Sequence, residues 1–159
     1  DALTGLHNRR YFDDALQEYL AAFARIEKPI GMILLDLDHF KSVNDTYGHN
    51  IGDEVLREVA LCLKDFTRYH DVVARLGGEE FAVLSPNITE RQIFELAERI
   101  RRAIAQIVVN AGGVSINVTV SAGIAIWDGN ETGQALYGRA DKQLYVAKRN
   151  GRNQVCTAA

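Results

Sequence analysis

The sequence has only two cysteines, Cys62 and Cys156, which lie far apart and match no metal-ligand spacing. Two such thiols do not make a disulfide framework, so we expect a reducing compartment: the cytoplasm, or the cytoplasmic portion of a membrane-anchored protein. Cys62 falls within an apolar helical pattern, which favours a buried free thiol. The cysteines therefore indicate neither a disulfide-stabilised fold nor a cysteine-bound metal.

Long apolar runs and an excess of one charge are also lacking. No stretch approaches the roughly 18 apolar residues of a membrane span, and no signal peptide opens the chain. The net charge is only −3 and the basic residues are dispersed, which gives no reason to expect nucleic acid or direct membrane contact. Any anionic ligand must therefore bind at a local site. Because the chain begins at Asp1, we expect it to be the C-terminal part of a longer protein.

What is present is an alternation of helical and strand-like patterns. Asn8 is a suitable N-cap for a first helix, which Pro29 ends. Residues 30–37 form a nearly continuous apolar run, typical of a strand buried on both faces. Gly77-Gly78 separates two β-like runs and predicts a hairpin. Helices are also expected around residues 55–63, 93–104 and 136–147, and strands at 72–76, 80–84, 118–127 and 154–156.

This order reads βαββαβ with additions. It predicts an α/β (α+β) fold with a ferredoxin-like core, in which helices flank a central, mostly antiparallel sheet. The 159 residues, of which 47% are apolar, suit one domain over residues 1–159 with a sizeable core. We find no internal repeat and no long linker.

Two aspartates, Asp36 and Asp38, stand where the buried strand ends. Acidic groups are costly at such a position unless they are paired or bound to a cation. An extended chain would place both on one face. Asp38 has a second interpretation, as the cap of a helix beginning at His39. Asp36 has none, and it is typical of a ligand for a hard cation.

The hairpin carries two adjacent glutamates, Glu79 and Glu80, after Gly77-Gly78. The turn explains the glycines, which tolerate positive φ, but it does not explain neighbouring like charges. Next to the strand of Asp36, a carboxylate at this turn could approach Asp36. Mg²⁺ typically binds one or two carboxylates together with substrate phosphates. The pattern is compatible with such a site and with a charged surface turn.

Residues 75–81, Arg-Leu-Gly-Gly-Glu-Glu-Phe, resemble the signature of the GGDEF family of diguanylate cyclases, in its GGEEF form. Residues 1–10, 36–41, 44–53 and 140–153 resemble the family's other motifs, so the resemblance covers essentially the whole chain. It implies condensation of two GTP molecules into cyclic di-GMP, with release of two pyrophosphates, in a fold similar to nucleotidyl cyclase and polymerase palm domains.

The resemblance also implies a metal centre. Asp36 and Glu79 would bind two Mg²⁺ ions through their side chains, with Mn²⁺ as an alternative, and Leu37 would add its backbone carbonyl. Glu79 is the implied general base. Glu80 is either a reserve metal ligand or a charge that supports the turn.

Phosphate binding is implied for two segments that lie far apart in the chain. The backbone amides of His39, Phe40 and Lys41 would form an anion site at a helix N-terminus, and Lys41 adds a mobile charge. Lys148 and Arg152 would contact the triphosphate tail. On spacing alone, these two residues could equally interact favourably with the dipole at the end of the last helix, which Gly151 would cap.

Guanine recognition is implied for Asn44 and Asp53. A carboxylate accepts hydrogen bonds from guanine N1 and the 2-amino group, whereas adenine offers no donor at those positions. Asp53 could alternatively stabilise the first turn of the following helix. His49 lies between them in the sequence and is either part of the pocket or structural.

A second, inhibitory site for cyclic di-GMP is implied by residues 68–71, Arg-Tyr-His-Asp, which five residues separate from Gly77. Arg68 and Asp71 would act with Arg99, because guanidinium groups stack on bases and grip phosphate. The alternative is a surface ion pair at i, i+3.

The implied partners are GTP, cyclic di-GMP, a second copy in a transient or regulated homodimer, and an upstream sensory or receiver domain. A catalytically silent GTP sensor or cyclic di-GMP receptor is the rival function. Such modules usually carry a damaged signature, which this chain does not.

Overall fold

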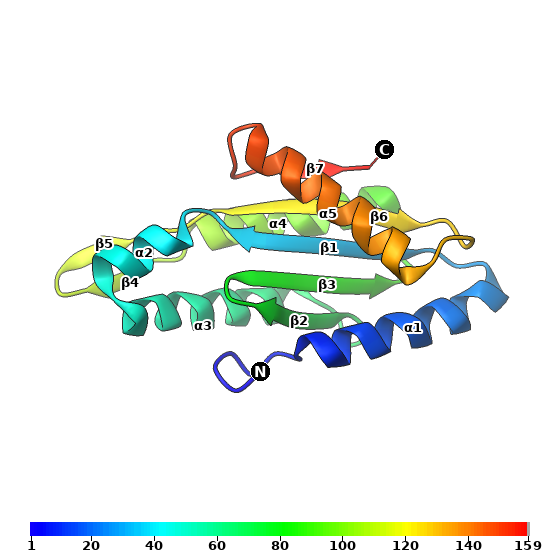
Figure 1. Cartoon of the computed structure of the whole chain (residues 1–159), viewed down its shortest axis with the longest axis horizontal. Coiled ribbons are helices and arrows are strands. Elements are labelled where there is room, and N and C mark those ends of the chain that lie inside the picture. Colours follow the sequence, from blue (N-terminus) through cyan, green and yellow to red (C-terminus); the bar gives the residue numbers. More distant parts are fainter. Residues whose placement is uncertain (159) are drawn as a thin grey trace.

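The computed structural model describes residues 1–158, in which helices and strands alternate along the chain (Figure 1). The helices are α1 (Arg9–Ile26), α2 (Phe40–Tyr47), α3 (His49–Phe66), α4 (Glu90–Ala105) and α5 (Gly133–Arg149). The strands are β1 (Ile30–Leu37), β2 (Val72–Gly77), β3 (Glu80–Pro86), β4 (Val109–Ala111), β5 (Val114–Ile116), β6 (Val120–Trp127) and β7 (Val155–Thr157).

Five strands form one sheet in the order β2-β3-β1-β6-β7. The central strand β1 is antiparallel to both β3 and β6, and only the β6–β7 pair is parallel. The predicted ferredoxin-like core with a mostly antiparallel sheet is therefore confirmed. No helix within residues 1–158 is long and apolar enough to cross a membrane.

Helices cover both faces of this sheet, which explains why all eight residues of β1 are buried. Alternate β1 side chains, including Met32 and Leu34, pack with α1 and α5. The others, including Ile33 and Leu35, pack with α3 and α4. At Gly123 in β6, a Cβ atom would overlap the backbone of α5, so glycine permits the close approach of helix and sheet.

The structure differs from the sequence prediction around the first helix after β1. That helix, α2, begins at Phe40, and its N-cap is His39, whose side chain makes no capping hydrogen bond. The interpretation of Asp38 as the helix cap is therefore wrong. A break at Gly48, with φ of 88°, separates α2 from α3. The helix expected around residues 55–63 therefore begins earlier, at His49, directly after the short helix that starts at Phe40.

Elsewhere the boundaries shift by a few residues. The strand expected from residue 118 begins at Val120, and the closing strand is Val155–Thr157. The two-stranded sheet of β4 and β5 was missed.

Cys62 and Cys156 are free and only partly buried, and burial raises the pKa of the Cys62 thiol to about 11.

Candidate active site

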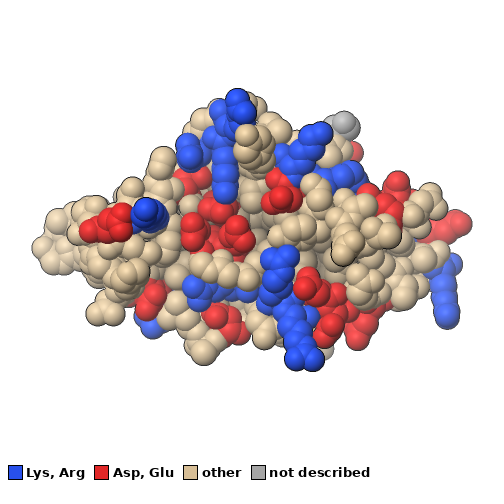
Figure 2. All heavy atoms as spheres, in the orientation of Figure 1, with Lys and Arg blue, Asp and Glu red and all other residues tan. Residues whose placement is uncertain are grey.

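Strand β1 and the β2–β3 hairpin bring the two acidic segments to the same end of the sheet. Asp36 lies opposite Glu80 in the antiparallel register, and the Leu37 amide donates to the Glu79 carbonyl at 3.2 Å. Gly78, with φ of 49°, makes the turn in a left-handed conformation. Figure 2, in the orientation of Figure 1, shows acidic side chains gathered near the middle of the visible face of the molecule, with basic side chains above and below them. The expected approach of the two segments is confirmed.

The Asp36 carboxylate is the buried member of this group, with 10% of its side chain exposed. Burial raises its pKa, and the negative charges of Glu79 and Glu80 raise it further. The ammonium of Lys148, on α5, lies 2.9 Å from Asp36 Oδ2 and acts in the opposite direction. The net shift is upward, because one partly exposed ammonium does not offset burial beside two other carboxylates. Additional positive charge near Asp36 would therefore stabilise its ionised form.

The donor atoms at this end of the sheet fit a hard cation. Carboxylate oxygens and a strand-end carbonyl are the ligands that Mg²⁺ prefers. Within residues 1–158, no group of three or more His, Cys, Asp or Glu side chains is arranged to hold a metal ion by itself. An ion bound through the oxygens of Asp36, Leu37, Glu79 or Glu80 would therefore need further ligands from a phosphate substrate and water.

Asn44 and Asp53 are brought together at the corner between α2 and α3. A Cβ atom at Gly52 would overlap the Asn44 side-chain oxygen, so that oxygen lies against the first turns of α3. Asp53 is the next residue of this helix and is partly exposed. His49 begins α3 and is exposed. The Asn44 amide therefore packs against the residue that precedes Asp53 in α3.

The segment between β1 and α2 offers its backbone more than its side chains. His39 and Lys41 are exposed, whereas the Phe40 side chain is buried in the core. Phe40 can therefore serve a ligand only through its amide. Arg152 lies in the loop after α5 and is exposed, with φ of 64°.

Arg75 is a residue whose contacts the sequence did not predict. Its Nε donates to the Gly78 carbonyl at 2.8 Å, and its Nη1 lies 3.3 Å from an Asp1 carboxylate oxygen. The His7 segment pairs with β2 beside it, because the Arg75 amide donates to the His7 carbonyl at 2.9 Å. The guanidinium therefore ties the start of the chain to the turn that carries Glu79. In the sequence, the only indication of a role for Arg75 was its place in the GGEEF signature, residues 75–81.

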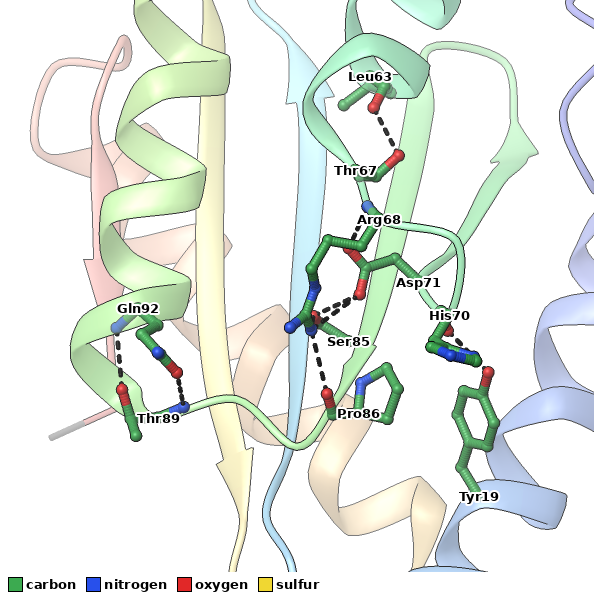
Figure 3. Close-up of polar contacts among 10 residues, drawn as sticks. All are labelled: Tyr19, Leu63, Thr67, Arg68, His70, Asp71, Ser85, Pro86, Thr89 and Gln92. Atoms are coloured by element: carbon green, nitrogen blue, oxygen red, sulfur yellow. Dashed lines mark hydrogen bonds and ion pairs between the residues drawn. The ribbon is translucent and has the colours of Figure 1, made fainter.

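Arg68, Asp71 and Arg99 meet at a separate cavity of about 210 Å³, which Phe66, Ile88 and α4 also line. Arg68 Nη2 donates to Asp71 at 3.2 Å and to Ser85 at 2.8 Å (Figure 3). The Asp71 side chain is fully buried, whereas that of Arg68 is 55% exposed. This is more than a surface ion pair, because the buried carboxylate fixes a guanidinium that solvent can still reach.

Comparison with known proteins matches residues 1–154 to the family described as diguanylate cyclase, GGDEF domain. The chain belongs to this family. It is 44% identical over 158 residues to the response regulator PleD of Caulobacter vibrioides, covering 98% of this chain and 35% of PleD. It spans less than half the length of the other curated relatives compared, such as the diguanylate cyclase DgcP.

Solved GGDEF structures share the fold. The GGDEF domain of DgcB from Caulobacter crescentus, in complex with c-di-GMP, has a TM-score of 0.97 and 37% identity, covering 99% of this chain and 92% of that one. The diguanylate cyclase SiaD of Pseudomonas aeruginosa, in complex with its activator SiaC, has a TM-score of 0.96 and 37% identity, covering 99% and 61%.

Proposed function

We propose that this chain is the catalytic domain of a diguanylate cyclase, which condenses two GTP molecules into cyclic di-GMP. The observation that carries the proposal is the placement of an intact GGEEF turn against Asp36, with Lys148 across from it. A silent GTP sensor or cyclic di-GMP receptor is not favoured, because the signature acids and the basic residues around them are all present.

In the reaction, the 3′-oxygen of one GTP forms a bond to the α-phosphorus of the other, and the bond to the pyrophosphate breaks. Asp36, Glu79 and the Leu37 carbonyl would hold Mg²⁺ or Mn²⁺, with Glu80 in reserve. A bound divalent ion neutralises triphosphate charge and lowers the pKa of the attacking hydroxyl. Glu79 would accept the hydroxyl proton, directly or through water.

The remaining residues bind and orient the substrate. Lys41, Lys148 and Arg152 supply positive charge to the triphosphate. The amides of residues 39–41, at the start of α2, add the donors typical of a helix N-terminus. At the α2–α3 corner, Asn44 and Asp53 would read the guanine edge, with His49 beside them. One domain thus holds one GTP.

Because each domain holds one GTP, two loaded copies must meet for turnover. We expect this chain alone to be slow, with pyrophosphate release per molecule rising as its concentration rises through the micromolar range. Pyrophosphate and cyclic di-GMP should appear in a two-to-one ratio when the chain is incubated with GTP and Mg²⁺. Activity per molecule that stays constant on dilution far below micromolar would contradict this mechanism, and no cyclic di-GMP at any concentration would contradict the function.

The need for two copies also suggests how the protein is regulated. An upstream sensory or receiver domain would control how often two catalytic domains meet. The name of PleD, a response regulator, and the complex of SiaD with its activator are consistent with such control. We place the reaction in the cytoplasm, where GTP is made.

We also propose that the Arg68 cavity binds the product and inhibits the enzyme from outside the catalytic site. Arg68→Ala should weaken cyclic di-GMP binding at least tenfold, about 1.4 kcal/mol, while turnover at low product stays nearly unchanged. Asp71 would keep two donors, the Ser85 hydroxyl and the Arg68 amide, so the fold should survive. Calorimetry measures the affinity, and Arg25→Ala, on the exposed face of α1, is the control. Unchanged product binding by Arg68→Ala would refute this site.

A further inference from the structure

Asp38 is a buried acid that the proposed mechanism leaves without a task. It is 6% exposed, and its carboxylate accepts three hydrogen bonds. Two come from hydroxyls, that of Thr119 just before β6 at 2.7 Å and that of Ser121 within β6 at 2.6 Å. The third comes from the backbone amide of Asn153, at 3.0 Å. A buried carboxylate is costly unless its partners are fixed, so this acid joins the end of β1 firmly to the loop after α5.

That loop has an unusual backbone. Gly151, Arg152 and Asn153 have successive φ values of 111°, 64° and 47°. Glycine adopts this region freely, and asparagine tolerates it, but for an arginine it is strained. Strained residues persist only where their surroundings hold them, and they concentrate at functional sites. Here the strain falls on the arginine that we propose binds the triphosphate.

The loop is held from two sides at Asn153. Its amide donates to Asp38, and its side-chain oxygen accepts from Arg101 Nη1, on α4, at 2.9 Å. Arg101 is itself fixed by Glu98, which accepts from Nε and Nη2 at 2.9 and 3.0 Å. Within the loop, the Arg152 amide donates to the Ala147 carbonyl at 3.0 Å. Both the backbone and the side chain of Asn153 are therefore anchored outside the loop.

We propose that Asp38 and Arg101 are positioning residues that hold the loop 150–154 so that Arg152 faces the triphosphate of GTP. The proposal rests on the proposed function. The loop begins two residues after Lys148, whose ammonium contacts Asp36. Neither Asp38 nor Arg101 need touch the substrate, because each acts through Asn153.

A double-mutant cycle tests whether Asp38 acts through Arg152. In the 159-residue chain, Arg152→Ala and Asp38→Ala should each weaken binding of a non-hydrolysable GTP analogue about tenfold. Because Asp38 would serve only to place Arg152, the double variant should bind little worse than either single variant. Losses that multiply to about 100-fold would show that the residues act independently and would overturn the proposal. Asp65→Ala, an exposed acid on α3, is the control.

A second pair of variants remains informative if Asp38→Ala folds poorly. Asn153→Gly and Asn153→Ala both lose the contact to Arg101, but only glycine adopts the left-handed backbone without strain. The glycine variant should therefore bind the GTP analogue more tightly than the alanine variant, by severalfold. Equal affinities would contradict the positioning role.

Amide hydrogen exchange separates this proposal from the proposed function. In the ligand-free chain, the Asn153 amide should exchange slowly, and Asp38→Ala or Arg101→Ala should speed its exchange. This measurement needs no catalysis, so it stands even if the chain makes no cyclic di-GMP. Unchanged exchange in both variants would show that the loop is not held by these residues, whatever the activity of the wild type.

Discussion

Asp36→Asn and Glu79→Gln should each abolish cyclic di-GMP synthesis while the fold stays intact. Each change keeps the shape of the side chain and removes the charge that would hold a divalent ion. Losing such a ligand removes several kcal/mol of transition-state stabilisation. Since about 1.4 kcal/mol is tenfold in rate, turnover should fall at least about a thousandfold. Pyrophosphate release, followed with and without excess Mg²⁺, measures the loss.

The stability of Asp36→Asn gives an internal check on this result. The folded-state pKa of Asp36 is raised, chiefly by burial, so its ionised form is disfavoured in the folded chain relative to the unfolded one. The wild type should therefore lose stability as the pH rises from the usual carboxyl pKa through the raised one, whereas the variant has no such titration. Above this window, the variant should melt at the same temperature as the wild type or higher.

A matched variant guards against a general effect of charge removal. Asp65→Asn, on the exposed face of α3, should keep full turnover. Recovery of more than a few per cent of wild-type activity in both Asp36→Asn and Glu79→Gln would sink the metal assignment.

The main elements of the fold could be predicted because their signals are local. The apolar run of β1 and the Gly77-Gly78 hairpin both appear where expected. The β4–β5 hairpin was missed although Gly112-Gly113 marks its turn, because three-residue strands are too short to show a clear alternation. The Asp38 prediction failed for a different reason. The start of α2 depends on the left-handed backbone of His39, which no side-chain pattern reveals.

The acidic end of the sheet was predictable in outline, since a hairpin beside β1 must bring its turn near Asp36. The contacts that complete it join residues more than a hundred positions apart. Lys148 reaches Asp36, and the Asn153 amide reaches Asp38, only because α5 packs back across β6. Spacing along the chain carries no trace of such pairs. Arg75 likewise gains its contacts from the packing of the N-terminal segment beside β2.

The chain should reject ATP in favour of GTP. A site built to hydrogen-bond one edge of a ligand rejects an analogue lacking the matching groups by roughly 10⁴–10⁵, because its polar atoms are left unpaired. We propose that Asn44 and Asp53 form such an edge, and the packing of the Asn44 oxygen against Gly52 restricts its position. The ratio of kcat/KM for GTP to that for ATP, each measured as pyrophosphate release, gives the preference directly.

Substitution of Asp53 decides whether that edge reads the base. Guanine N1 and its 2-amino group are donors, and adenine presents no donor to the same carboxylate, so Asp53→Ala should lower kcat/KM for GTP far more than for ATP. The preference should therefore collapse by at least about a hundredfold, since a lost hydrogen bond to a charged group is worth about 1.5–3 kcal/mol and two donors are involved. Asp65→Ala should keep the wild-type ratio. Similar kcat/KM values for ATP and GTP in the wild type, or an undiminished preference in Asp53→Ala, would refute the role given to this corner, because the base would then be read elsewhere.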